Sequence, residues 1–85
     1  MWYVYIVKCS DESSTLYTGI TNDITKRINT HNKGLGSKLL RGSKLPVSLF
    51  WYEEHTDRSS ASKREYEIKQ LSRIEKIKLK NPSNL

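Results

Sequence analysis

Two tyrosine motifs, an arginine, a histidine and a glutamate are the side chains of this chain that are best suited to chemistry. The motifs are Tyr3-Val4-Tyr5 and Tyr17-Thr18-Gly19, and they are followed by Arg27, His31 and Glu65. Together they supply phenols that can act as weak acids or bases, a permanent cation, an imidazole and a carboxylate. This combination is suited to the metal-assisted attack of water on a phosphodiester bond. No other constellation in the sequence offers comparable chemistry.

The two tyrosine motifs must be positioned by strands. Residues 2–9 are apolar on both faces and rich in aromatic and β-branched side chains, which predicts a central strand covered on both sides. Turn-forming residues at 10–14 separate it from a second hairpin strand at 16–21. Tyr5 and Tyr17 share a face only if odd-numbered residues pair with odd-numbered ones, and a turn longer than two residues leaves that register open. Ordinary half-buried strand tyrosines are the alternative interpretation.

Arg27 and His31 fall four residues apart in a predicted helix over residues 24–31, so they lie on one helix face. That face borders the apolar stripe, which predicts that both side chains sit at the lip between sheet and solvent. A guanidinium there can bind two phosphate oxygens. A surface arginine and a capping histidine are the alternative. The expected cap is Asn22 or Asp23, and the expected stop is Lys33-Gly34.

The rest of the chain predicts a mobile basic loop, a third strand and two helical segments. The loop spans residues 35–45, and the strand spans 47–54 after Pro46. A long helix begins at Asp57 or Ser59 and breaks near Ser72, with an amphipathic piece at 74–79. We therefore expect an α+β fold over residues 1–80, a small three-stranded antiparallel sheet flanked by helices in the order β-β-α-β-α-α, and a frayed tail at 81–85.

Glu65 lies on the same helical face as Ala61 and Ile68, the face expected to pack against the sheet. A carboxylate on an apolar face needs a partner, because burying it unpaired is costly. Two partners are available: a divalent metal, or Lys69 four residues later on the same helix.

The net charge of +6 is concentrated in the middle of the chain. Residues 24–52 contain no Asp or Glu, whereas basic and acidic residues balance elsewhere. This pattern predicts binding to a polyanion, although a merely solvated basic surface would look the same. Besides Arg27, the expected nucleic-acid contacts are Lys26, Lys33, Lys38, Arg41 and Lys44.

The composition excludes several classes of protein. Cys9 is the single cysteine, so there is no intrachain disulfide, and one Cys with two His cannot form a four-ligand zinc site. Any metal must therefore be held mainly by oxygen. The apolar N-terminus is too short for a secretory signal or a membrane span, so we expect a cytoplasmic protein with no membrane partner.

In this order and spacing, the motifs resemble the signature of the GIY-YIG nuclease superfamily, and most of all its short, stand-alone branch. The resemblance implies that Tyr5 or Tyr17 activates the water, that Arg27 holds the scissile phosphate and that His31 assists. It also implies that Glu65 binds one Mg²⁺ or Mn²⁺ and that Gly19 keeps the backbone low beside the tyrosines. In the basic loop, Leu39-Leu40-Arg41 replaces the aromatic and threonine that related sequences often carry before the cation.

The expected function is that of a metal-dependent nuclease acting on DNA, with RNA as the second choice. The chain has no room for a separate target-binding domain, so recognition should follow structure and phosphates rather than sequence, unless a protein partner supplies the target. The alternatives are a nucleic-acid-binding module with little turnover and a protein-interaction role.

Overall fold

Strand β1 (Trp2–Lys8) is the centre of a three-stranded antiparallel sheet in the computed structural model, which describes residues 1–79. Strand β2 (Leu16–Thr21) pairs with one edge of β1, and β3 (Ser48–His55) pairs with the other. Residues 4–7 of β1 are each at most 2% exposed. The prediction of a central strand covered on both sides is therefore confirmed, and so is the α+β fold.

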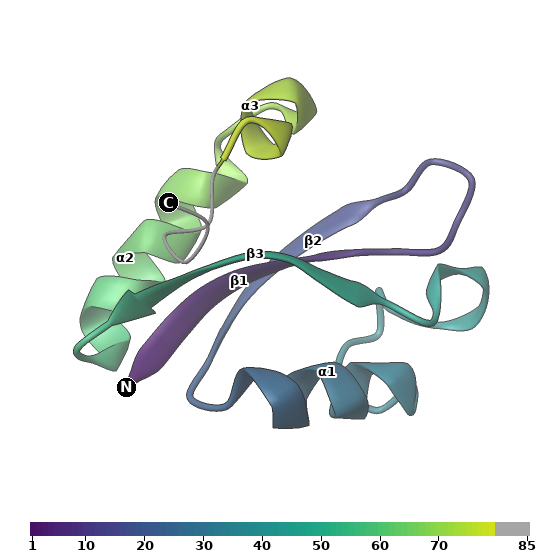
Figure 1. Cartoon of the computed structure of the whole chain (residues 1–85), viewed down its shortest axis with the longest axis horizontal. Helices are drawn as coiled ribbons and strands as arrows, with labels where there is room; N and C mark the ends of the chain where they lie inside the picture. Colours follow the sequence, from purple (N-terminus) through teal and green to yellow (C-terminus); the bar gives the residue numbers. More distant parts are fainter. Residues whose placement is uncertain (80–85) are drawn as a thin grey trace.

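The two faces of the sheet carry separate apolar clusters. Helix α2 (Arg58–Lys69) covers one face, and α1 (Ile24–Asn32) lies on the other (Figure 1). Even-numbered side chains of β1 pack towards α2 and odd-numbered ones towards α1, as the strand pleat requires. The cluster under α2 consists of Val4, Ile6, Trp51, Ala61 and Ile68. The cluster under α1 consists of Tyr5, Val7, Cys9, Leu40 and Val47.

Side-chain caps fix where the helices begin. The Asp23 carboxylate accepts a hydrogen bond from the Lys26 backbone N–H at 3.0 Å, and Asp57 caps α2 in the same way. Helix α3 (Arg73–Ile77) starts at Ser72 with a reciprocal capping box to Glu75, so the predicted break at Ser72 is confirmed. Helix α1 stops where Gly34 takes a φ of +76°, a conformation that favours glycine.

The basic loop between α1 and β3 is anchored to the core, contrary to the expectation of a mobile segment. Leu40 is only 1% exposed and packs in the cluster under α1. The Asn32 side chain accepts a hydrogen bond from the Val47 N–H at 2.6 Å and donates one to its carbonyl at 3.2 Å. A single 3₁₀ turn, η1 (Gly42–Lys44), completes the loop. An isolated leucine in a loop has no periodicity, so the sequence pattern did not reveal this anchor. The predicted tail at 81–85 lies outside the described residues.

Candidate active site

The register of the hairpin brings Tyr5 and Tyr17 to the same face of the sheet. Tyr5 pairs with Gly19, and Val7 pairs with Tyr17, so odd-numbered residues stand opposite odd-numbered ones. This is the register that a shared tyrosine site requires. Tyr5 is 2% exposed, whereas Tyr17 is half-buried and reaches the surface.

His31 joins the two tyrosines from the last turn of α1. Its Nε2 atom lies 2.9 Å from the Tyr5 hydroxyl, in a buried hydrogen bond. Its ring packs edge-on against Tyr17, with the ring centroids 5.6 Å apart. His31 is only 1% exposed, so the expectation that it sits at the lip with Arg27 is wrong. His31 lies one helical turn after Arg27, where Gly36 of the following loop stands against its imidazole ring.

Two glycines make room for this arrangement. A Cβ atom on Gly19 would come within 2.6 Å of the Tyr5 hydroxyl oxygen, so any larger residue there would displace the phenol. A Cβ atom on Gly36 would overlap the His31 ring at Nδ1. Gly19 was predicted at the site, although in the role of admitting substrate. Gly36 was missed, because a glycine in a loop gives no signal of what it contacts.

Burial favours the neutral forms of both Tyr5 and His31 at neutral pH. Burial raises the pKa of Tyr5 to about 12, and the Glu65 charge adds to the shift, whereas the Arg27 guanidinium opposes it. Burial also lowers the pKa of His31, and the charge of Arg27 lowers it further. A neutral imidazole can accept the Tyr5 hydroxyl proton through Nε2 only in the tautomer that carries hydrogen on Nδ1. In residues 1–79 that Nδ1 atom is buried without a hydrogen-bond partner.

Arg27 and Glu65 approach the tyrosines from opposite faces of the sheet. Both charges act on the Tyr5 phenol, although Arg27 belongs to α1 and Glu65 to α2. The Nε atom of Arg27 is buried and has no hydrogen-bond partner among the described residues. Charges of opposite sign therefore stand on the two faces of the sheet, and each shifts the pKa of Tyr5.

Glu65 uses one of the two partners that the sequence offered. Its Oε2 atom lies 3.3 Å from the Lys69 ammonium nitrogen, and the Glu65 side chain keeps 23% of its surface exposed. The described part of the chain has no group of three or more His, Cys, Asp and Glu side chains that could enclose a metal ion. One carboxylate with open surface fits a hard cation that keeps most of its waters and does not fit a closed protein cage.

Comparison with known proteins agrees with this geometry. Residues 1–78 match the family model of the GIY-YIG catalytic domain. The chain belongs to the GIY-YIG family. It is similar to the UPF0213 protein CPE1444 of Clostridium perfringens, with 51% identity over 79 residues, 93% of this chain and 82% of the relative. It is 49% identical to the UPF0213 protein SH2523 of Staphylococcus haemolyticus, over 91% of this chain and 90% of that protein.

A solved structure shows the same fold. The solution NMR structure of the UPF0213 protein BH0048 from Bacillus halodurans matches with a TM-score of 0.52 and 39% identity, covering 89% of this chain and 79% of that one. The resemblance and the fold expected from the sequence are therefore confirmed. The GIY-YIG domain implies a nuclease family and a nucleic-acid substrate. None of the helices within residues 1–79 has the length and apolar character needed to cross a membrane.

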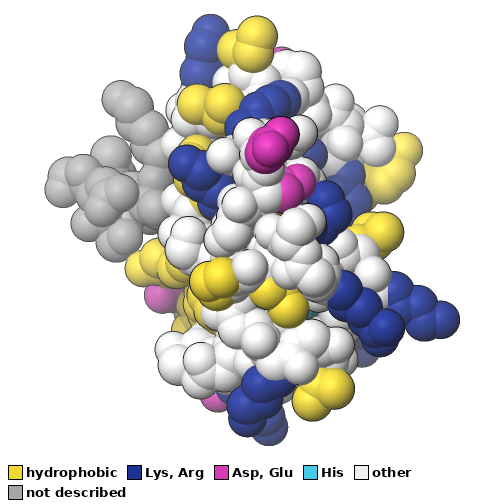
Figure 2. Space-filling view, turned by 90° about the vertical axis from the view of Figure 1, so that its right-hand side faces the viewer, with side chains coloured by type: hydrophobic (Ala, Val, Ile, Leu, Met, Phe, Trp, Pro, Cys, Tyr) yellow, Lys and Arg dark blue, Asp and Glu magenta, His cyan; other side chains and the backbone are white. Residues whose placement is uncertain are grey.

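The cations expected to bind nucleic acid are not equivalent in this GIY-YIG protein. Lys33, Lys38 and Arg41 are exposed on and before the anchored loop. Lys44 instead forms an ion pair with Asp11 of the hairpin turn at 3.2 Å. Lys26 lies beside Arg27 in a surface pocket. Figure 2 shows Lys and Arg side chains scattered over one face of the molecule, with a group of them at its right-hand edge.

Proposed function

We propose that this GIY-YIG protein is a metal-dependent nuclease that hydrolyses phosphodiester bonds in DNA and recognises strand structure rather than base sequence. The observation that carries the proposal is the cluster of Tyr5, His31 and Tyr17, whose Tyr5 phenol is also affected by the charges of Arg27 and Glu65. The hydrogen-bonded Tyr5–His31 pair lies beneath Tyr17, and the charges of Arg27 and Glu65 both reach it. The match of residues 1–78 to the GIY-YIG catalytic domain supports the same reaction class.

The proposed roles follow from exposure. Tyr5 is buried with a pKa of about 12, so it is poorly suited to take a proton from water and better suited to orient His31. Tyr17 packs on the same imidazole but reaches the surface, so we assign to Tyr17 the role of activating the attacking water. Arg27 holds the scissile phosphate and stabilises the charge that builds on its oxygens during attack.

Glu65 would hold one Mg²⁺ or Mn²⁺ ion. Its partly exposed carboxylate can give up the ion pair with Lys69 and bind a divalent cation instead. Such a cation also binds phosphate oxygens and water. When bound, such an ion lowers the pKa of a coordinated water or neutralises charge on the leaving oxygen. The fit supports a metal carried in with the substrate rather than one held in a preformed cage.

The experiment is a cleavage assay on labelled DNA and RNA of several structures, with Mg²⁺, Mn²⁺ or chelator. Glu65→Gln should abolish metal-dependent cleavage and leave binding nearly intact, because an amide is a poor ligand for a hard cation. Glu67→Gln is the matched control, since Glu67 is on the same helix but pairs with Arg64 at 3.1 Å, and its side chain is 64% exposed. Arg27→Lys should keep binding and slow cleavage, because it keeps the charge but loses the planar fork.

A nucleic-acid-binding module with little turnover is the second candidate, and the Glu65–Lys69 ion pair is the observation that favours it. In that case Lys69→Met should reduce stability about as much as Glu65→Gln does, and metal should change nothing. Absence of cleavage on every substrate, with metal-independent binding retained, would move the assignment to this module.

A further inference from the structure

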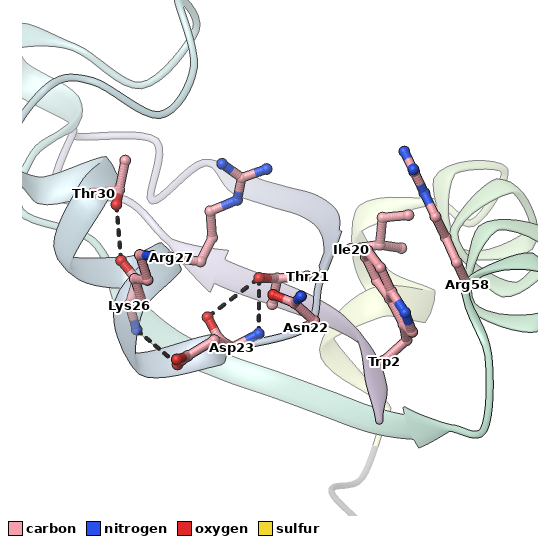
Figure 3. Close-up of a pocket in the computed structure, with 9 residues that line it drawn as sticks. All are labelled: Trp2, Ile20, Thr21, Asn22, Asp23, Lys26, Arg27, Thr30 and Arg58. Atoms are coloured by element: carbon pink, nitrogen blue, oxygen red, sulfur yellow. Dashed lines mark hydrogen bonds between the residues drawn. The ribbon is translucent and has the colours of Figure 1, made fainter.

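A pocket of about 350 Å³ opens at the free edge of β2, beside the candidate active site. It lies between the start of α1 and the start of α2, and it includes Arg27 (Figure 3). Its volume is at the small end of the range that ligand pockets in proteins occupy. The residues that define its two sides are Trp2, Ile20 and Arg58 on one, and Lys26, Arg27 and Thr30 on the other.

Trp2 and Arg58 form a cation–π pair on the side of the pocket that faces Arg27. The guanidinium carbon of Arg58 lies 5.4 Å from the centroid of the Trp2 ring, a cation–π distance. Trp2 also packs against the apolar cluster under α2, so the indole is held in place. Arg58 is exposed as the first residue of α2 and forms no ion pair within residues 1–79. Its guanidinium, which already lies over the indole, is therefore available to stack on a second ring.

The opposite side of the pocket carries two cations, Lys26 and Arg27, together with the Asp23 carboxylate that caps α1. Lys26 and Arg27 project from the first turns of α1, and the Arg27 Nε atom is buried without a hydrogen-bond partner in the described chain. In Figure 3 the Arg27 side chain and the Trp2–Arg58 pair stand on opposite sides of β2 residue Thr21. The pocket thus combines a phosphate-binding side with an aromatic and guanidinium side. This is the pairing by which proteins bind single-stranded nucleic acid.

We propose that this pocket is a nucleotide subsite, in which an unpaired nucleobase stacks on Trp2 and Arg58 while its phosphate lies at Arg27. The inference rests on the proposed nuclease function and narrows its substrate class. A base inside a duplex is already stacked on its neighbours, so the protein would act where the base next to the scissile phosphate is unpaired. Because every base has a π face, the subsite requires no particular sequence.

The first test is a binding cycle in chelator, so that it does not depend on cleavage. The ligands are a labelled oligothymidylate and an oligomer of equal length and charge whose sugars carry no bases. Wild-type protein should bind the oligothymidylate roughly 5- to 150-fold more tightly, the range expected for one stacked base. Trp2→Leu keeps an apolar side chain in the cluster and should abolish that preference. Trp2→Phe keeps a ring and should retain most of it.

The second readout is tryptophan fluorescence, which reports stacking directly. Trp51 is 2% exposed in the core, so quenching by oligothymidylate should come from Trp2 and should disappear in Trp2→Phe although binding remains. The base-free oligomer should not quench the wild type. Equal affinity of the wild type for both oligomers, or quenching that persists in Trp2→Phe, would overturn the subsite.

The outcomes for subsite and function are separable. Cleavage without a base preference would reject the subsite and leave the nuclease standing. A base preference that depends on Trp2, without cleavage of any substrate, would support the subsite in a binding module.

Discussion

Replacing Gly19 by alanine should unseat the Tyr5–His31 pair and destabilise the whole domain. The added methyl would stand 2.6 Å from the Tyr5 hydroxyl oxygen and 2.8 Å from the ring carbon that carries it. Tyr5 cannot swing away freely, because it is 2% exposed within the cluster under α1. Overpacking of a core typically costs about 1–3 kcal/mol, and loss of the buried hydrogen bond to His31 adds about 1 kcal/mol.

We therefore expect Gly19→Ala to lower the free energy of unfolding by about 2–4 kcal/mol. For a domain of this size that corresponds to a Tm lower by roughly 10–25 °C, measured by circular dichroism. Cleavage should fall as well, because His31 loses the group that orients it. Gly42→Ala is the control. Gly42 has a φ of +60°, so an added Cβ there strains the backbone, but the space around it is open. This substitution should cost about 1–2 kcal/mol without affecting the site.

A double-mutant cycle tests the cause. Tyr5→Phe removes the atom nearest to the new methyl, so Gly19→Ala should cost at least about 1 kcal/mol less in that background. The reasoning would be refuted by a single variant within about 0.5 kcal/mol of wild type, which is the range of ordinary surface changes. Additive costs in the cycle would show that the damage arises elsewhere, for example in the edge strand itself.

Three further predictions concern pH and charge. Burial lowers the pKa of His31, so as the pH falls the unfolded chain takes up a proton at this histidine before the folded chain does. The free energy of unfolding, measured with urea at a series of pH values, should therefore begin to fall below about pH 6.5. His31→Gln should remove this pH dependence. Hydrogen bonds from Thr15 hold the pKa of Asp11 at about 2. Asp11→Asn should therefore have a lower Tm than the wild type at neutral pH, and the difference should disappear as the pH falls from about 4 to 2. Replacing the three exposed cations Lys33, Lys38 and Arg41 with alanine should flatten the slope of log affinity for nucleic acid against log salt concentration by up to about 3. Lys44→Ala should change the slope little, because Lys44 is paired with Asp11. A Lys44→Ala effect as large as that of each exposed cation would contradict this docking surface.

The sequence by itself determined the elements and the family. Local signals are strong here: the β-branched and aromatic run of β1, the capping residues before α1 and α2, the break near Ser72 and the glycine stop at Gly34. The structure then selected Asp23 over Asn22 and Asp57 over Ser59 as the caps. These local signals depend on neighbours within a few residues, so they can be read along the chain. The order of the tyrosine motifs, Arg27, His31 and Glu65 was enough for the family resemblance, which the match over residues 1–78 confirms.

Only the tertiary structure decided how those residues meet. The odd-with-odd register that places Tyr5 beside Tyr17 follows from the hairpin turn and the packing of both sheet faces, which no local pattern encodes. The burial of His31 depends on the loop that follows α1. Leu40 packs that loop into the cluster under α1, and Asn32 accepts a hydrogen bond from Val47, 15 residues later in the sequence. Trp2 and Arg58 are 56 positions apart, and their pairing exists because the end of β3 returns the chain to the start of β1. Contacts of this kind form between segments that are remote in sequence, so their partners can be identified only once the chain is folded.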